Sequence, residues 1–349
     1  MLNSHFRVTS PTDAGAISRL MQLAFGISRD SPLLGAEYMD WKYWRPHPEW
    51  EGSRSFALER EGNIVAHAAV IPLRCAWGSR RLKMVHMIDV VARPKAQMPL
   101  IALMKNVARL AEGWFASGGS DIANKFLPMV GFQESARATM FALPLRPAAR
   151  LRGEPIDSWR PVARFARDIL WKMQAAYNPA KGWGARKISA ANLAIEPFPV
   201  PHPTVETAVF ERSVPAIALL FECPLTPVEF YLVERQGSVC GYFILTLAIS
   251  QCRIADAWME SNRAQDWRAL YKLAVRTAMA HPGVVELVTM AVTEGPAARA
   301  LAEVGFRRRG QIALRFRIPN LNPPANVHFQ MVDGDAAVLH DADRTQFWT

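Results

Sequence analysis

The sequence has few cysteines and no pattern of metal ligands. Its four cysteines form no Cys-x-x-Cys pair, which argues against a zinc finger and against a dithiol redox motif. No group of His, Cys, Asp and Glu residues has the spacing of a metal site. We therefore expect buried free thiols, a reducing cytoplasmic compartment and no metal.

Long hydrophobic runs are also absent. No apolar stretch approaches the roughly 18 residues that a membrane-spanning helix requires, and the first residues lack the apolar core of a secretion signal. Half of the 349 residues are nevertheless hydrophobic. That is enough apolar material for two domains of about 150 residues, each with its own packed core.

Negative charge is scarce in one part of the chain. The formal net charge is +10, and the segment from Arg146 to Lys187 holds ten Lys and Arg residues but only three acids. The rest of the chain is therefore close to neutral. A nucleic-acid-binding protein would more often carry its basic residues on the binding face of a domain, so this pattern argues against nucleic acid as a partner.

An amphipathic helix is predicted inside this basic segment, over Trp159–Ala176. Arg160, Arg164 and Arg167 lie on one face of it. The opposite face is apolar and consists of Val162, Phe165, Ala166, Ile169, Leu170 and Met173. Two interpretations are open. The arginines of a connecting helix point into water, or they contact an anionic surface, either membrane phosphates or a charged substrate.

An internal repeat is the most informative feature that is present. Residues 56–75 and 230–248 each read as an apolar strand, a charged turn around one glycine, and a second apolar strand. Each is followed by a strand, a long helix with an apolar face, another strand and a Val-Gly-Phe triplet. The spacing from turn glycine to triplet glycine is 69 residues over Gly62–Gly131 and 68 residues over Gly237–Gly305.

A matching order of elements at nearly equal spacing predicts two copies of one domain. We place the first domain at 1–145 and the second at 204–319. The basic linker then occupies 146–203, and a proline-rich, later acidic tail occupies 320–349.

Short motifs accompany the repeat. They are Glu61–Val65, Asp89–Val91 with Pro94, Gly131-Phe132, Gln236–Val239 and Ala298–Phe306, and a tryptophan-lysine stretch over Met39–Trp44. Their order along the chain resembles that of the GCN5-related N-acetyltransferase (GNAT) superfamily, in which tandem copies occur. The tryptophan-lysine stretch resembles a signature of a bacterial subset. The resemblance implies an α/β (α+β) fold of two tandem GNAT-like domains, each a mixed, mostly antiparallel central sheet flanked by helices.

The resemblance also implies acetyl-CoA or another acyl-CoA as co-substrate. In this superfamily a glycine-containing loop before the long helix cradles the pyrophosphate, because glycines let backbone N–H groups approach it. Here Gln97 fits the pattern, but Met98 and Leu100 stand where the glycines are expected, and Pro99 lacks an N–H. The second copy, over Asn262–Leu270, has no glycine. The cradle is therefore damaged in both copies, and more severely in the second.

The pantetheine arm of the donor would pair with the backbone near Asp89–Val91. The candidate cofactor-binding residues are Val90, Val91, Gln97, Met98, Leu100 and Ile101.

Catalysis in this superfamily commonly needs a base for the amine and a tyrosine acid on the last helix. No tyrosine lies within Asn124–Val130 or Gly295–Val304, and the first of these helices is expected to be about a turn short. The candidate bases are His86 and Asp89 on the central strand, which project to opposite faces if that strand is regular. A histidine has a suitable pKa near neutrality, although both residues also fit purely structural roles.

The leading interpretation is an acyltransferase that moves an acyl group from an acyl-CoA to a small-molecule amine such as an amino sugar, with the first copy catalytic. Two alternatives stay open. A FemABX-like aminoacyl-transferase would take its amino acid from charged tRNA and need no CoA cradle. A non-catalytic binding protein on a degenerate GNAT fold would need neither glycines nor tyrosines.

Overall fold

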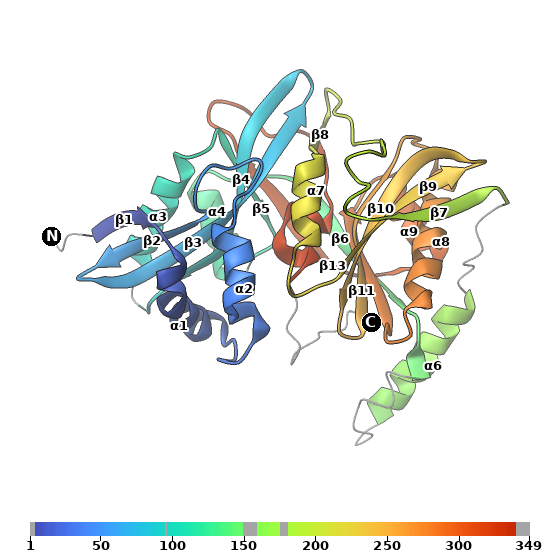
Figure 1. Ribbon diagram of the computed structural model, residues 1–349, viewed down its shortest axis with the longest axis horizontal. Coiled ribbons are helices and arrows are strands. Elements are labelled where there is room, and N and C mark those ends of the chain that lie inside the picture. Colours follow the sequence, from blue (N-terminus) through green and yellow to red (C-terminus); the bar gives the residue numbers. More distant parts are fainter. Residues whose placement is uncertain (1–3, 95, 120, 149–158, 175–180, 340–349) are drawn as a thin grey trace.

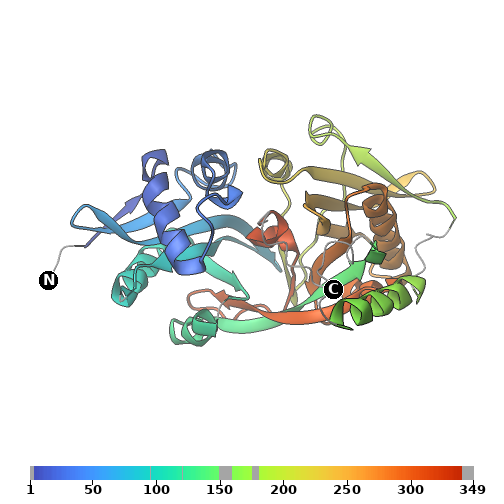
Figure 2. The same ribbon diagram turned by 90° about the horizontal axis from the view of Figure 1, so that it is seen from below.

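The computed structural model describes residues 4–94, 96–119, 121–148, 159–174 and 181–339. Within these residues one continuous sheet of fourteen strands runs through the molecule, and helices pack on its two faces. Figure 2 shows the blue helix α1 on one side of the first-half strands and the teal helices α3 and α4 on the other.

The first half contains the following elements: β1 (Ser4–Val8), α1 (Ala14–Phe25), α2 (Ala36–Met39), η3 (Asp40–Trp44), β2 (Ser55–Arg60), β3 (Asn63–Trp77), β4 (Arg80–Ala92), α3 (Gln97–Ala108), β5 (Gly113–Ser117), α4 (Asp121–Met129) and β6 (Gln133–Pro144).

The second half contains these elements: α6 (Trp159–Gln174), β7 (Trp183–Ile188), β8 (Thr207–Phe210), α7 (Val214–Phe221), β9 (Val228–Arg235), β10 (Ser238–Ala248), β11 (Gln251–Met259), α8 (Ala264–Ala280), β12 (Glu286–Val292), α9 (Pro296–Val304), β13 (Arg307–Arg317), β14 (Asn326–His328), η4 (Met331–Asp333) and η5 (Asp335–Ala337).

The two halves repeat one order of elements, and the predicted hairpins are confirmed. The turn between β2 and β3 contains Glu61 and Gly62, and the turn between β9 and β10 contains Gln236 and Gly237. All four residues have positive φ, between 51° and 83°. Two consecutive positive φ angles define the tight turn whose twist matches that of the flanking strands, and glycine accepts them without strain.

The last strand of each half pairs inside the other half. Strand β13 pairs with β5, β6 pairs with β12, and β6 and β13 pair with each other, all antiparallel. In Figure 1 the green β6 and the red β13 therefore cross the centre of the molecule between the two halves. The boundaries 1–145 and 204–319 stay a prediction, and each of these ranges contributes a strand to the sheet of the other.

The helices largely follow the sequence prediction. Helix α8 covers the predicted long helix of the second half, and α3 covers that of the first. The expectation that the last helix of the first half is a turn short is wrong, because α4 begins at Asp121 and has nine residues, as α9 does. No described helix has both the length and the apolar character needed to cross a membrane.

The linker helix α6 lies beside the second half of the molecule (Figure 2) and contacts it through Trp171. Arg167 forms an ion pair of 2.7 Å with the buried Asp168. The guanidinium groups of Arg167, Arg307 and Arg309 lie 4.3, 5.3 and 4.8 Å from the centre of the Trp171 ring. The exposed apolar residues of α6 are Trp159, Val162, Ile169 and Leu170. The side chain of Arg160 lies outside the described residues.

Phe115 of β5 joins the two halves in the core. Its ring is 4.9 Å from Phe210 of β8, 5.1 Å from Phe316 of β13 and 5.7 Å from Phe329. The Phe115 side chain is fully buried. Because these partners come from distant parts of the chain, their packing couples the exchanged strands to the C-terminal segment.

We expect Phe115→Ala to lower the free energy of unfolding by about 3–5 kcal/mol, because it removes a buried ring and leaves a cavity. The urea unfolding curve should keep a single transition, since both halves share the sheet. The control is Phe25→Ala, at a ring that is half exposed, which should change stability by only about 0.5 kcal/mol. Independent unfolding of the two halves in the wild-type protein would contradict the coupling.

Candidate functional site

Strands β4 and β5 form a fork in the first half. They run parallel and pair only from Met84–Gly113 to His86–Phe115, although β4 continues to Ala92. The edge of β4 beyond His86 therefore faces no strand partner among the described residues. An unpaired strand edge presents backbone N–H and C=O groups that an extended ligand can satisfy.

A bulge sits on β4 just beyond the fork. The pairing with β3 shifts between His67–Val91 and Ala69–Ile88, and Asp89 has a φ of 50°. The extra residue reverses the alternation of side chains along the strand. The regular strand assumed from the sequence is therefore wrong, and Asp89 points toward α2 and η3, on the same side as Ile88.

Asp89 lies in a buried ion pair. Its Oδ2 is 2.7 Å from Nζ of Lys42 and accepts a hydrogen bond of 2.8 Å from the Tyr43 hydroxyl. Burial alone would raise the pKa of Asp89, but the charge of Lys42 and the two hydrogen bonds lower it below its ordinary value. The pKa of Lys42 is raised well above its ordinary value by Asp89, against the opposing effect of burial. Both groups are therefore charged.

The second half contains an equivalent cluster. Asp89 lies five residues after Met84, where β4 first pairs with β5, and Asp256 lies five residues after Gln251, where β11 first pairs with β12. Asp256 accepts hydrogen bonds of 2.6 Å from Arg212 and 2.8 Å from the Tyr242 hydroxyl. Each half thus buries an acid at a corresponding place, together with a cation and a tyrosine; the tyrosine comes from η3 in the first half and from β10 in the second.

The C-terminal segment connects these two clusters. Oδ1 of Asp333 lies 2.7 Å from Nη1 of Arg212, in an ion pair that is less well aligned than a hydrogen bond. Asp335 lies 3.5 Å from Lys42. Lys42 and Arg212 are therefore each flanked by two carboxylates, one from a central strand and one from the segment that contains η4 and η5.

His86 holds the same segment in place. Its Nδ1 lies 3.1 Å from the carbonyl oxygen of Asp333, which can only accept, so Nδ1 carries the proton. Nε2 is then free to accept from the N–H of Ser117 at 3.4 Å. Burial lowers the pKa of His86, against the opposing effect of Asp335, and the ring is neutral.

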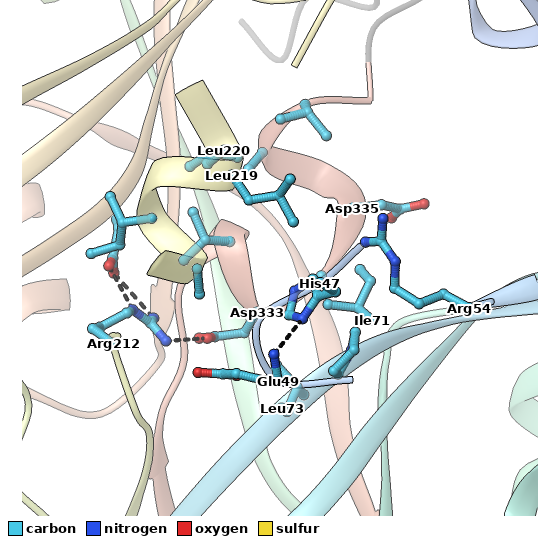
Figure 3. A pocket seen from close by; sticks show the side chains of 18 of the residues that line it. His47, Glu49, Arg54, Ile71, Leu73, Arg212, Leu219, Leu220, Asp333 and Asp335 are labelled. Carbon is cyan, nitrogen blue, oxygen red and sulfur yellow. Dashed lines mark hydrogen bonds and ion pairs between the residues drawn. The ribbon is translucent and has the colours of Figure 1, made fainter. Parts of the chain in front are cut away.

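A cavity of about 140 Å³ lies between the two clusters. Figure 3 shows side chains entering it from the first half, from α7 and the residue Arg212 before it, and from the C-terminal segment. Most of its wall is aliphatic, and Ile88 places it beside the fork. Its charged residues are Lys42, Glu49, Arg54, Arg74, Glu211, Arg212, Asp256, Asp333 and Asp335. Neither predicted catalytic residue, His86 or Asp89, lines this cavity.

One carboxyl group of the cavity, that of Asp333, has a pKa that is raised toward neutrality. Burial raises its pKa to about 6, although Arg212 opposes the shift. Oδ2 accepts a hydrogen bond of 2.7 Å from the N–H of Gln330. A buried carboxylate with such a pKa can exchange a proton near neutral pH.

The predicted cofactor-binding residues lie around the fork and the first turn of α3. Val91 is buried and Val90 is partly buried, whereas the Met98 side chain is 74% exposed. Leu100 packs on the core beneath α3, and Ile101 lines a separate surface hollow between α3 and α4. The backbone of Gln97 begins α3, but its side chain lies outside the described residues.

The fork of the second half is occupied by the chain itself. The His328 ring of β14 lies 4.9 Å from the Trp258 ring and 6.5 Å from the Trp267 ring. Trp258 belongs to β11 beyond its last pair with β12, and Trp267 belongs to α8. These aromatic rings fill the place that stays unpaired in the first half.

Sequence reasoning missed most residues of the cavity. Lys42 lies in the tryptophan-lysine motif, and that signal identified it without a role. Arg212 and Asp333 stand in segments with no motif, and the sequence shows only that the tail is acidic. No signal marks Arg54, which precedes β2.

Comparison with known proteins supports the fold. No protein-family model matches the chain, and no curated protein matches it. A GCN5-related N-acetyltransferase from Anabaena variabilis ATCC 29413 is 13% identical, with a TM-score of 0.58 over 91% of this chain and 73% of that chain. One from Kribbella flavida is 13% identical, with a TM-score of 0.55 over 91% and 71%.

A third solved structure is an N-myristoyltransferase from Saccharomyces cerevisiae with bound myristoyl-CoA and inhibitors. It is 11% identical, with a TM-score of 0.60 over 93% of this chain and 83% of that chain. At such identities the likeness shows the fold alone. The chain has the fold of the GCN5-related N-acetyltransferases, with a mixed sheet flanked by helices, and this part of the sequence prediction is confirmed.

We expect Lys42→Met to lower the free energy of unfolding by about 3–5 kcal/mol, because it leaves Asp89 buried without a counterion. Adding Asp89→Asn should recover part of this loss in a double-mutant cycle measured by urea unfolding. The lowered pKa of Asp89 means that the pair stabilises the wild type above pH about 4 and that this contribution is lost on further acidification. Lys125→Met, at an exposed lysine of α4, is the control. Additive losses in the cycle would contradict the coupling of the pair.

Proposed function

We propose that the protein transfers an acyl group from an acyl-CoA thioester to the amine of a small molecule, and that the first half carries the reaction. The observation that carries this proposal is the position of the cavity. It touches β4 at Ile88, two residues beyond the last pair of the fork. A thioester lying in the fork would therefore present its carbonyl carbon to an amine in the cavity.

The donor would use backbone groups rather than a glycine loop. The unpaired edge of β4 around Val90 and Val91 would bind the pantetheine arm. The first turn of α3 would bind the pyrophosphate, because the first N–H groups of a helix have no partner inside it. Pro99 removes one of these donors, so this site is weaker than a glycine-rich one. The filled fork of the second half favours a structural role for that half.

Asp333 would act as the base. In the proposed step the ammonium group of the acceptor first passes one proton to the Asp333 carboxylate. The free amine nitrogen then attacks the thioester carbonyl carbon, and the C–S bond breaks. The CoA thiolate leaves and takes up the second proton of the nitrogen, which gives an amide and free CoA thiol. Under this proposal His86 and Asp89 position the site. His86 bonds the Asp333 carbonyl, and Asp89 fixes Lys42. Their direct catalytic role stays a prediction.

Acyl-CoA binding and thiol release test the proposal. Calorimetry with acetyl-CoA and with longer acyl-CoAs should detect binding of at least one of them, and amines should then stimulate release of free thiol. Failure of all thioesters to bind would overturn the proposal. Transfer from aminoacyl-tRNA would then support the FemABX-like alternative, and the absence of any transfer would support the non-catalytic one.

We expect kcat/KM for acyl transfer to rise about tenfold per pH unit below pH 6 and to level off above it. The reason is that the base must be deprotonated and the pKa of Asp333 is about 6. Asp333→Asn should lower kcat by a factor of about 10²–10⁴ and abolish this rise. Asp266→Asn changes another buried carboxyl, on α8, and should keep the wild-type profile. An unchanged profile in Asp333→Asn would exclude Asp333 as the base.

We also propose that α6 contacts an anionic membrane surface. The sequence suggested this contact through Arg160, Arg164 and Arg167. The structure adds an exposed apolar surface on the same helix, at Ile169 and Leu170. An amphipathic helix in a segment of high positive charge suits the interface of an anionic bilayer.

Vesicle sedimentation tests this contact. The protein should bind vesicles that contain phosphatidylglycerol and not vesicles of phosphatidylcholine alone. The pair Ile169→Ser and Leu170→Ser should reduce binding several-fold, because each buried apolar group adds to the affinity. Leu23→Ser, at an exposed leucine of α1, is the control. Equal vesicle binding of the double variant and the wild type would contradict the proposal. The proposal would also fail if the wild type did not bind vesicles but formed dimers that the double variant does not form.

A further inference from the structure

Three buried cations line the cavity, and two of them have carboxylate partners. Lys42 lies between Asp89 and Asp335, and Arg212 lies between Asp256 and Asp333. In each cluster two carboxylates face one cation, so both clusters carry excess negative charge. The third cation is Arg54.

Arg54 has no carboxylate partner within ion-pair distance in the part of the chain that the structure describes. Its side chain is only 6% exposed. Nη2 donates to the carbonyl oxygens of Trp41 and Arg45, and Nε is buried without a hydrogen-bond partner. Burial, with a smaller effect from Arg45, lowers the pKa of Arg54 to about 10, while the charge of Asp40 partly opposes this shift. The group is still cationic at neutral pH.

A buried guanidinium without a counterion is unfavourable, because the protein interior replaces water poorly around a charge. Folded proteins therefore pair such groups with an anion. The planar guanidinium fork fits a carboxylate through two parallel hydrogen bonds. His47, beside Arg54 in the cavity wall, is neutral, because burial lowers its pKa to about 4. An anionic ligand in the cavity would supply the close partner that no described carboxylate provides within ion-pair distance.

The cavity walls also fit a cation at the other end. Figure 3 shows Arg54 and Asp333 entering the cavity from opposite sides, with Asp333 next to Arg212. At the end away from Arg54 the negative charge lies with Asp333, whereas Asp335 is drawn on the same side as Arg54. A molecule with an ammonium group at one end and a carboxylate at the other matches this distribution.

We propose that the acceptor is a carboxylate-bearing amine, of the amino-acid class, and that Arg54 binds its carboxylate while its amine faces Asp333. This inference rests on the proposed function, since it names the acceptor of that reaction. An outer hollow of about 440 Å³ lies next to the cavity and shares Glu49, Arg74, Glu211 and Arg212 with it. The hollow gives such an acceptor a polar route from solvent.

Binding in the absence of any acyl-CoA tests the inference. The probes are glycine, β-alanine and 4-aminobutyrate, each compared by calorimetry with the amine that lacks the carboxylate, and with inorganic phosphate as a separate arm. The wild-type protein should bind at least one amino acid at least tenfold more tightly than its decarboxylated counterpart. Arg54→Gln should reduce this preference to less than about twofold, and Arg54→Lys should restore part of it.

Arg60→Gln makes the same change at the other end of β2 and should keep the wild-type preference. Ligand-induced shifts of the melting temperature provide a second measurement, which also shows that each variant is folded. The inference is overturned if no amino acid binds, if phosphate alone binds as tightly, or if the preference survives in Arg54→Gln.

The outcome is separable from that of the proposed function. If simple amines stimulate thiol release as well as carboxylate-bearing amines do, the proposed acyl transfer stands and the proposed amino-acid acceptor is wrong. Binding of amino acids that depends on Arg54, without binding of any thioester, would preserve the site and remove acyl transfer.

Discussion

The arrangement of this molecule depends on two buried cations that each lie between two carboxylates. Lys42 and Arg212 belong to opposite halves, and in both cases the second carboxylate comes from the segment around η4 and η5. Buried ions are stable only when their partners are correctly placed. The C-terminal segment must therefore lie across both halves in one register, with His86 bonding its backbone. The walls of the cavity follow from this placement, because that segment closes the space between β4 and α7.

The two halves show how one scaffold diverges around a shared acid. Asp89 and Asp256 occupy equivalent places beyond the first parallel pair, and each accepts a tyrosine hydroxyl. Their surroundings differ in what lies at the fork. In the first half the edge of β4 beyond His86 faces no strand partner among the described residues. In the second, the ring of His328 packs between tryptophans. The acid is therefore part of the scaffold in both halves, and the two halves differ in what lies beside the unpaired strand edge.

The sequence predicts the local structure well because the signals are local. Gly62 and Gly237 mark the hairpins, and the apolar period marks the long helices. The strand exchange leaves no such signal, since β6 and β13 read as apolar strands whatever they pair with. The bulge is equally hidden, because a non-glycine residue, Asp89, adopts the positive φ. The cavity combines Arg54, Arg212 and Asp333, which are far apart in the sequence and meet only through the exchanged sheet and the returning tail.

The three buried cations of the cavity differ in how closely a carboxylate pairs with them. Compensated charges such as Lys42 and Arg212 contribute structure, because their fields are largely neutralised by their partners. An uncompensated charge such as Arg54 keeps its field, and in a cavity with aliphatic walls that field is weakly screened. The fold keeps Arg54 buried without a close carboxylate, although Lys42 and Arg212 in the same cavity wall are each paired with carboxylates. An unfavourable group of this kind persists where a ligand relieves it. It therefore points to the cavity, rather than to the repeated hairpins, as the place where this chain differs from a bare scaffold.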